Sequence, residues 1–373
     1  MLCTPWHFVA SLIKLFLSSS KSHARRYLNS AKVTSSRDPR MPLLLTEEDV
    51  AKAVTPLDII EAVEDGFRQH GLGLAQTQPR REVRIRGKEL PHADPRMVRI
   101  AQGLAFLEQS AIVVTHHIFS FPDRGRPMRI VNHLIDADNG DLVAVVESLG
   151  LLGMRTGAAS AVGAKYLSRK DSSVAGIVGT GRQGRIQLRF LSKVRSLKKA
   201  YAYSLVPSET GKFCAEMSAE LGIDVSHSES IEQLVRRSDI LVTATNSTTP
   251  FVKAEWLSPG VHVNIMGADD RPKIELEGAA LKKAGKLVIA AEDSLAAGQL
   301  QIPMAEGVIE RKDIYGTLGE IVAGAKPGRE GDDEITIFHS PGVTLQDAAA
   351  THKAYVLAKR LGLGTNSDLS FFL

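Results

Sequence analysis

The sequence predicts an α/β fold in which a doubly wound parallel sheet occupies the middle of the chain and an α+β domain is built from both chain ends. From about residue 172 to residue 292, short apolar runs alternate with helical patterns. From residue 77 to residue 146, β-rich runs are separated mainly by turn signals. A chain of 373 residues also exceeds one ordinary core and fits two domains of ~100–200 residues.

Residues 1–40 differ from the rest of the chain in charge and composition. They hold seven lysines and arginines and one acidic residue, a charge of +6, which leaves −2 for the remainder of a chain whose net charge is +4. An apolar, then serine-rich, then basic segment is compatible with a targeting peptide. We favour a non-functional extension upstream of a second start at Met41, and exclude the segment from the fold.

Composition argues against several function classes. A body close to neutrality offers no basic surface for nucleic acid. No apolar run approaches the ~20 residues that span a bilayer, so no membrane partner is expected. Cys3 and Cys214 form neither a disulfide framework nor a metal cluster, so we expect no metal and a reducing, cytoplasmic location, with a targeting peptide left open.

The first domain begins with two capped helices and continues as strands. Thr46 and Thr55 are each followed three residues later by an aspartate, and proline stands in the first turn of the second helix. The β-rich runs that follow predict an antiparallel sheet with helices beside it. They are residues 83–86, 111–115, 131–135 and 142–146.

The second domain begins after an alanine-rich helix at residues 156–167. Its strands are predicted at residues 174–178, 199–203, 239–243, 261–266 and 287–291, with helices at 183–192, 210–221 and 230–237. Alternation of this kind predicts a parallel sheet covered on both faces. A last strand, 334–338, and a helix, 345–361, are expected to return to the first domain. The predicted boundaries are 41–153 with 333–366, and 154–332.

A glycine-rich turn follows the first strand of this second domain. It reads Gly179-Thr180-Gly181-Arg182-Gln183-Gly184 and opens a helix. The first glycine permits the tight turn, the second lets a pyrophosphate approach the backbone, and the third lets helix and strand pack closely. The helix N-terminus offers free N–H groups to the phosphates. The six residues therefore predict a Rossmann domain that binds NAD(H) or NADP(H).

The choice between the two nucleotides rests on the second strand. The acidic residue expected there for NAD is missing, and Ser204 and Ser208 could contact a 2′-phosphate although no arginine stands beside them. The choice stays open, with a slight preference for NADP(H). Thr243 and Gly267 lie at carboxyl ends of parallel strands, where such folds bind ligands, and we expect both to contact the cofactor.

Four motifs resemble the ornithine cyclodeaminase/mu-crystallin family in order and spacing, over about residues 43–361. They are residues 154–161, the turn at 179–184, residues 264–269 with 273–276, and residues 338–342, where Ser340 is assigned to the cofactor. The resemblance implies an NAD(P)-dependent homodimer in which a substrate and dimerisation domain faces the Rossmann domain.

The resemblance also implies roles for individual residues. It assigns Arg155 to the carboxylate of a small amino or imino acid substrate, with help from Arg84, and assigns proton exchange with the substrate amine to Asp269. A guanidinium fork matches a carboxylate, and a partly desolvated aspartate can act as acid and base.

The sequence departs from the family at two positions. The family's strand lysine falls on Ile112, and a threonine that lines the cofactor pocket is replaced near Met128. One interpretation moves the proton donor to His116 or His117, of which at most one points into the cleft because adjacent strand residues face opposite sides.

The function predicted first is an NAD(P)-dependent oxidoreductase acting on the carbon–nitrogen bond of a small amino or imino acid, as a ketimine or cyclic imine reductase or an amino acid dehydrogenase. One alternative is a redox-neutral cyclodeaminase or an amino acid-condensing synthase. Another is a nucleotide-binding protein with little catalysis.

Overall fold

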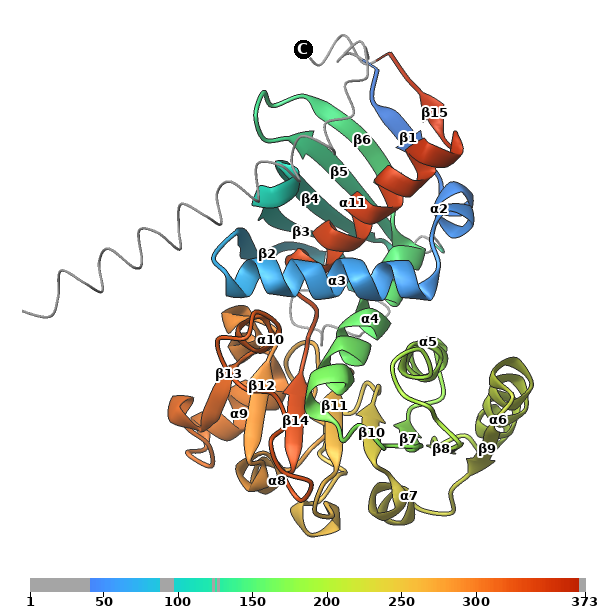
Figure 1. Cartoon of the computed structure of the whole chain (residues 1–373), viewed down its shortest axis with the longest axis vertical. Helices are drawn as coiled ribbons and strands as arrows, with labels where there is room; N and C mark the ends of the chain where they lie inside the picture. The colour runs from blue at the N-terminus through green and yellow to red at the C-terminus, as the bar shows by residue number, and fades with distance from the viewer. Residues whose placement is uncertain (1–40, 88–96, 123–124, 126–127, 369–373) are drawn as a thin grey trace, which may run out of the picture.

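The computed structural model describes residues 41–87, 97–122, 125 and 128–368, and this part of the chain forms two β-sheets, one above the other in Figure 1. The upper sheet draws its strands from both chain ends, and the lower sheet from the middle of the chain. This arrangement confirms the predicted fold class. The predicted extension, residues 1–40, lies outside the described residues.

The upper sheet has seven strands, which pair antiparallel except for the parallel pair β1 and β6. In spatial order they are β15 (Thr365–Asn366), β1 (Leu43–Leu45), β6 (Leu142–Glu147), β5 (Arg129–Asp136), β4 (Ile112–Ser120), β3 (Val98–Leu107) and β2 (Ala75–Arg86). The sequence did not predict β3. Its alanines, glutamine and glycine are not strong strand formers, so its pairing with β2 and β4, rather than its composition, defines it as a strand.

Helices cover one face of this sheet. They are α2 (Glu47–Ala53), α3 (Pro56–Gly71) and α11 (Thr344–Leu361). The capping boxes predicted at Thr46 and Thr55 are both present. Helix α11 lies directly on β3, because a Cβ atom on Gly103 would stand only 2.1 Å from Thr344 Oγ1. Glycine at this position lets the helix approach the strand.

The lower sheet has eight strands, all parallel. In spatial order they are β13 (Ile314–Thr317), β12 (Lys286–Ile289), β14 (Thr336–His339), β11 (His262–Ile265), β10 (Ile240–Thr243), β7 (Val174–Val178), β8 (Lys199–Tyr203) and β9 (Asp224–His227). The strand order reverses between β7 and β10, and such switch points are where doubly wound sheets bind dinucleotides.

Helices connect the strands of the lower sheet. They are α5 (Arg182–Leu191), α6 (Pro207–Leu221), α7 (Ile231–Arg237), α8 (Gly278–Lys283), α9 (Gly298–Ala305) and α10 (Leu318–Val322). Within the described ranges, no helix is long and apolar enough to cross a bilayer.

Strand β14 corrects one expectation. The strand predicted at residues 334–338 was expected to join the first domain, but β14 lies between β11 and β12 in the parallel sheet. All four of its residues are buried, as expected for a strand covered on both faces. Of the two elements predicted to return to the first domain, only the helix, α11, packs on the upper sheet.

Helix α4 (Leu149–Leu167) connects the two sheets, so the predicted boundary at residue 153 falls inside a helix. Its glycines allow close contact with the lower sheet and α5. A Cβ on Gly157 would stand 2.7 Å from Ile186, and one on Gly163 would stand 2.6 Å from Phe338. The same helix packs against α3 and α11 of the upper domain, so it contacts both domains.

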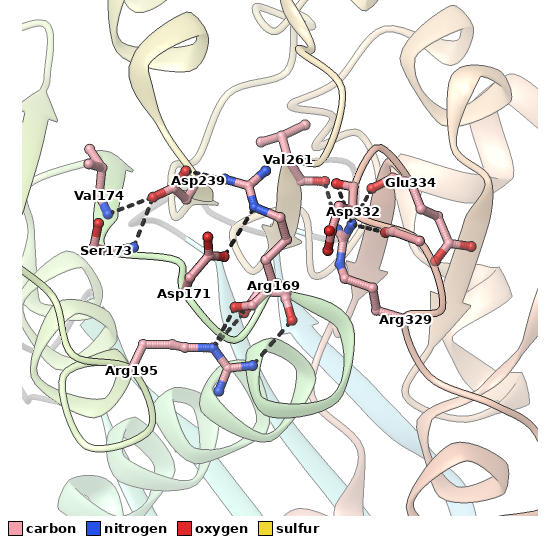
Figure 2. Close-up of polar contacts among 12 residues, drawn as sticks. Arg169, Asp171, Ser173, Val174, Arg195, Asp239, Val261, Arg329, Asp332 and Glu334 are labelled. Carbon is pink, nitrogen blue, oxygen red and sulfur yellow. Dashed lines mark hydrogen bonds and ion pairs between the residues drawn. The ribbon is translucent and has the colours of Figure 1, made fainter.

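Three arginines fix the end of α4 at the base of the lower sheet (Figure 2). Arg195 donates to the carbonyls of Ala164 and Lys165, which lie in the last turn of the helix. Arg169 pairs with Asp239 at 2.5 Å, and Arg329 donates to the carbonyl of Glu334 at 2.6 Å. The guanidinium groups of Arg195 and Arg329 satisfy carbonyl oxygens left open by the helix end and the loop, and Arg169 forms an ion pair beside them, so all three have a structural role.

Candidate functional site

The glycine turn lies between β7 and α5, at the switch point of the sheet. Gly179 has φ +105°, and a Cβ there would stand 2.4 Å from the carbonyl oxygen of Ala244. A Cβ on Gly184 would stand 2.1 Å from the carbonyl oxygen of Gly179, whereas one on Gly181 would meet nothing within 4 Å. The first and third glycines are required by packing, and the second faces open space, as a bound pyrophosphate needs.

Helix α5 begins at Arg182, and its N-cap residue, Gly181, has no side chain to occupy the free N–H groups. Thr180 is buried, and its carbonyl accepts a hydrogen bond from Arg185. Arg182 donates to the carbonyl of Leu149 at 2.6 Å, at the start of α4. The residues present therefore fit a dinucleotide whose phosphates lie at this helix end.

A buried carboxylate, Glu275, fixes the loops after β10 and β11. Thr243 Oγ1 and the Gly267 backbone N–H donate to its Oε2 at 2.8 and 3.0 Å, and Thr245 donates twice to its Oε1 at 2.7 Å. Burial raises the pKa of Glu275, and these hydrogen bonds oppose that shift. Two of the predicted cofactor residues, Thr243 and Gly267, are thus held at the carboxyl edge of the sheet, with the Thr243 hydroxyl already bonded.

The end of β8 is the position that discriminates NAD from NADP in this fold. Ser204 follows the strand, and its hydroxyl lies 2.8 Å from Thr210 Oγ1 and 3.1 Å from the carbonyl oxygen of Val206. Leu205, the next residue, is 89% exposed. The loop therefore presents a hydroxyl group where an NAD-specific site would carry a carboxylate.

A cavity of about 450 Å³ lies beside the glycine turn and between the two sheets. Gln183 of the turn lines it, as do the predicted residues Arg155, Asp269 and Ser340. The other lining residues are Pro79, Arg80, Arg81, Glu82, Arg99, Ala101, Ile118, Met128, Leu152, Thr156, Met266, Asp270, Asp293, Ala296, Ala297, Pro341 and Gly342. Volumes in this range suit small-molecule ligands.

Two guanidinium groups in the cavity share one buried carboxylate. Asp347, on α11, accepts from Arg155 Nε at 2.8 Å and from Arg80 at 2.7 Å. Burial alone would raise the pKa of Asp347, but the charges of Arg155 and Arg80 hold it well below the ordinary range. Removing this carboxylate would leave two cations close together without a counter-charge.

Further contacts hold the Arg155 guanidinium in place. Its Nη1 donates to Gln346 Oε1 at 3.0 Å, and the Gln346 amide donates to Ser340 Oγ at 3.0 Å. Gly342, with φ +88°, leaves room for the group, because a Cβ there would stand 2.5 Å from Nη1. Arg155 is 3% exposed, so its charge is fixed at the cavity wall in one orientation.

His116 lies outside the cavity lining and supports the arginines from within the domain. Its Nδ1 lies 2.8 Å from Asn132 Oδ1 and 3.9 Å from Asp347 Oδ1, and Asn132 donates to Thr351. Burial lowers the pKa of His116 to about 4, so the ring is neutral at pH 7. We therefore reassign His116 from proton donor to a member of the network behind Asp347.

His117 points to the opposite face of the sheet, as the alternation of the strand predicts. Its Nε2 lies 3.0 Å from Thr115 Oγ1, and its ring packs edge-on against that of His133 with centroids 5.0 Å apart. Neither histidine of the pair at 116 and 117 is therefore among the cavity residues.

Arg84 and Ile112 are not among the residues that line the cavity, although Arg84 pairs with two residues that are, Glu82 and Asp270. Arg84 bonds to Glu82 Oε1 at 2.5 Å, while Arg80 reaches the cavity from the same strand. A register shift between Gln78 and Arg81 explains the difference, since simple alternation fails across it. Ile112 packs in the hydrophobic core at the start of β4, whereas Ile118 lines the cavity.

Asp269 lies in the loop after β11 and lines the cavity. Lys273 pairs with its Oδ1 at 2.6 Å, and the Asp269 side chain is 42% exposed. Met128, near which the sequence predicts replacement of the family's threonine, also lines the cavity, next to an apolar cluster that contains Ala101, Ile118 and Leu152.

Sequence reasoning missed Arg80, Asp347 and the role of Glu275. Only Glu275 lay inside a motif that was singled out, and Arg80 stood four residues from the arginine chosen instead. Nothing near Asp347 in the sequence marked it. Across the described part of the chain, no cluster of three or more potential ligands could hold a metal ion.

Comparison with known proteins decides the family. A model described as the ornithine cyclodeaminase/mu-crystallin family matches residues 40–360. The chain belongs to this family. Alanine dehydrogenase from Archaeoglobus fulgidus is 35% identical over 333 residues, which is 88% of this chain and 98% of that protein. Iminosuccinate reductase from Paracoccus denitrificans is 31% identical over 332 residues, 88% of this chain and 100% of that protein.

Solved structures of family members have the same architecture. Δ1-pyrroline-2-carboxylate reductase from Thermococcus litoralis, in complex with NADH and L-proline, has a TM-score of 0.80 and 36% identity over 87% of this chain and 100% of its own. An archaeal alanine dehydrogenase dimer with bound NAD has a TM-score of 0.81 and 34% identity over 88% of this chain and 99% of its own.

Proposed function

We propose that this protein is an NAD(P)H-dependent reductase of small 2-imino acids that also runs in reverse as an amino acid dehydrogenase. The observation that carries the proposal is a cavity that joins Gln183 of the nucleotide turn to the paired guanidinium groups of Arg155 and Arg80. When bound, the reduced nicotinamide supplies a hydride, and the protein must bind, orient and protonate the other reactant.

The arginines would bind the substrate carboxylate. Arg155 and Arg80 are held by one carboxylate, which leaves further N–H groups for a second, exchangeable carboxylate. Because Asp347 and Gln346 fix the Arg155 guanidinium before substrate arrives, little side-chain entropy is lost on binding. Asp269, on the same cavity, would exchange protons with the substrate nitrogen.

The proposal is tested by following oxidation of NADH and NADPH with a panel of substrates. The panel contains Δ1-pyrroline-2-carboxylate, its six-membered homologue, and 2-oxo acids with ammonia or methylamine. We expect turnover with a cyclic or linear imine, and Arg155→Ala should lower kcat/KM by ~100-fold or more, given the worth of a charged bidentate contact. Arg68→Ala, which breaks a surface ion pair with Asp65, is the control.

Other outcomes identify the alternatives. Product without net change in nicotinamide would indicate a redox-neutral cyclodeaminase or a synthase. Tight nucleotide binding without turnover of any panel member would indicate a binding protein. Activity unaffected by Arg155→Ala would contradict the assignment of that residue to the substrate.

We also propose that two copies of the chain pair through the face of the upper sheet opposite α11. Gly103 and Asn132 lie on the face of the sheet that contacts α11. Because side chains alternate along a strand, the residues before and after them point to the opposite face. That second face carries half-buried apolar residues, namely Leu104, Phe106, Val113, Phe119 and Ile135. The related archaeal alanine dehydrogenase is described as a dimer. Light scattering should give twice the chain mass, and Val113→Glu should give monomers.

A further inference from the structure

Asp293 is a carboxyl group of the cavity that has no role in the site described so far. Asp293 lies on the short 3-10 helix η4 (Glu292–Ala296), which follows β12 at the carboxyl edge of the parallel sheet. Asp293, Ala296 and Ala297 line the cavity together. Ligands of doubly wound sheets bind at this edge, so Asp293 stands where a reacting group would be needed.

The hydrogen bonding of Asp293 differs from that of the other aspartates of the site. Asp347 lies between two guanidinium groups, and Asp269 is paired with the Lys273 ammonium. The Asp293 Oδ1 atom is buried and has no hydrogen-bond partner among the described residues. An ionised carboxylate needs donors to both oxygens, so a carboxyl with one bare, buried oxygen favours its neutral, proton-bearing form.

Burial acts in the same direction and outweighs the surrounding charges. Burial raises the pKa of Asp293, while Arg80 and the backbone N–H groups of Asp293 and Ser294 oppose the shift, and Glu292 adds a smaller contribution that raises the pKa. The other charged groups of the cavity are Arg81, Glu82, Arg99 and Arg155 from the upper sheet and α4, and Asp269 and Asp270 from the loop after β11.

Arg80 connects Asp293 to the substrate position. Arg80 is one of the two arginines assigned to the substrate carboxylate, and its charge acts directly on Asp293. In a 2-imino acid the nitrogen is bonded to the carbon next to the carboxylate. A substrate anchored on Arg80 and Arg155 in a cavity of about 450 Å³ must therefore hold its nitrogen among the same lining residues.

We propose that Asp293 is a second catalytic acid, which delivers the proton that the substrate nitrogen takes up with the hydride, while Asp269 exchanges the further proton that converts the amine to its ammonium form. This inference rests on the proposed function. The substrate carbon gains hydride from the reduced nicotinamide, the C=N π electrons pass to nitrogen, and nitrogen takes the proton of Asp293. The nicotinamide is oxidised, the imine becomes an amine, and the Asp293 carboxylate regains a proton from water.

Asp293→Asn tests the assignment, because an amide can donate a hydrogen bond but cannot deliver a proton. We expect kcat for imine reduction to fall ~100-fold with KM changed less than about threefold, as for loss of a general acid. Wild-type kcat should decline as pH rises through the pKa of Asp293, and this decline should be absent from the variant. Asp293→Glu, which keeps a carboxyl group, should recover part of the activity.

The matched control is Glu292→Gln, which removes the neighbouring charge. Glu292 is exposed and pairs with Arg311 at 2.5 Å, and this variant should retain kcat within about twofold. NADH affinity, measured by fluorescence, should be the same in both variants and the wild type, which shows that the fold is intact. A variant Asp293→Asn with wild-type kcat and pH profile would overturn the inference.

A spectroscopic measurement separates this inference from the proposed function. Infrared difference spectra of the wild type, recorded as pH is raised, should show a carboxyl group losing its proton above the ordinary aspartate pKa of about 3.9, in a band that is missing from Asp293→Asn. Any band from Glu275, whose pKa is also raised by burial, should appear in both proteins. If the wild type and Asp293→Asn give the same bands, Asp293 holds no proton and the inference fails. If the band is present but no imine is reduced, the proposed function fails.

Discussion

The nucleotide turn and the arginine cavity lie side by side and are built in opposite ways. The turn uses six consecutive residues, 179–184, and acts through backbone atoms and the absence of side chains. The cavity uses side chains from distant segments, since Arg155 and Asp347 are 192 residues apart in sequence and Arg80 and Asp347 are 267 apart. One site depends on local conformation, and the other on correct packing of α4, α11 and β2.

The largest effect that this comparison predicts is at Gly179. In Gly179→Val the new Cβ atom would stand 2.4 Å from the carbonyl oxygen of Ala244, which is too close. The backbone at this position also has φ +105°. β-branched residues are strongly disfavoured there, so the turn must change shape. We expect no measurable NADH binding by fluorescence titration. Gly211→Ala, whose Cβ meets nothing within 4 Å, should bind normally. Wild-type affinity in Gly179→Val would show that the turn is not the nucleotide site.

Asp347→Asn should give the next largest effect, and this effect should be on stability and on substrate turnover rather than on nucleotide binding. It leaves two guanidinium groups without a counter-charge in a buried site, which costs about 3–5 kcal/mol of unfolding free energy. Substrate kcat/KM should fall ~100-fold or more, while NADH affinity should change little. Chemical denaturation measures the free energy of unfolding, and steady-state kinetics measure kcat/KM for the substrate.

The control for Asp347→Asn is Glu48→Gln, which breaks an exposed ion pair with Lys52. It should change the free energy of unfolding far less than Asp347→Asn does, and it should leave the kinetics unchanged. If Asp347→Asn lost nucleotide binding as severely as substrate binding, the two sites would not be independent.

The network behind the arginines predicts a dependence of stability on pH. The pKa of His116 is lowered by burial to about 4, against about 6.5 in an unfolded chain. As pH falls below 6.5 the unfolded chain binds this proton first, so the folded state loses stability until pH reaches about 4. Between pH 6.5 and 5 the loss from this group is about 1.6 kcal/mol.

Denaturation of the wild type and of His116→Asn at several pH values measures this contribution. The variant should lose less stability over the same interval. His262, His339 and His352 also reduce stability as pH falls, because burial lowers their pKa values to about 3, 4 and 4. Their contribution is the same in both proteins. Equal slopes for the two proteins would show that His116 is not neutral and buried.

The smallest predicted effect concerns the choice of nucleotide. Ser204→Asp places a carboxylate at the end of β8, where it can accept from ribose hydroxyls and repel a 2′-phosphate. The ratio of kcat/KM for NADH over NADPH should rise by ~10-fold or more. Leu205→Asp, at the exposed neighbouring position, should change the ratio much less. An unchanged ratio in Ser204→Asp would place the discriminating contacts elsewhere.

The parallel sheet and its turn were predictable because their signals are local. The apolar strand before Gly179, the capped helices at Thr46 and Thr55, and the strand–helix alternation all depend on neighbours in sequence. Strand β14 was identified but assigned to the wrong domain, because a short apolar strand carries no information about its partners.

The substrate cavity was predictable only in part. Arg155 and Asp269 came from motifs, and both line the cavity. Arg80 was missed because the register shift in β2 hides which arginine points inward. Asp347 and Asp293 owe their properties to burial and to partners from other segments, and neither burial nor partners can be read from a single sequence.

Helix α4 has a consequence for exchanging parts between relatives. It begins beneath the upper sheet, carries Arg155, and ends against the base of the lower sheet. A chimaera joined before residue 149 transfers the anchoring arginine with the nucleotide half, and one joined after residue 167 leaves it with the other half. Carboxylate recognition would survive such a graft only if the donor of α4 and the donor of α11 were the same protein.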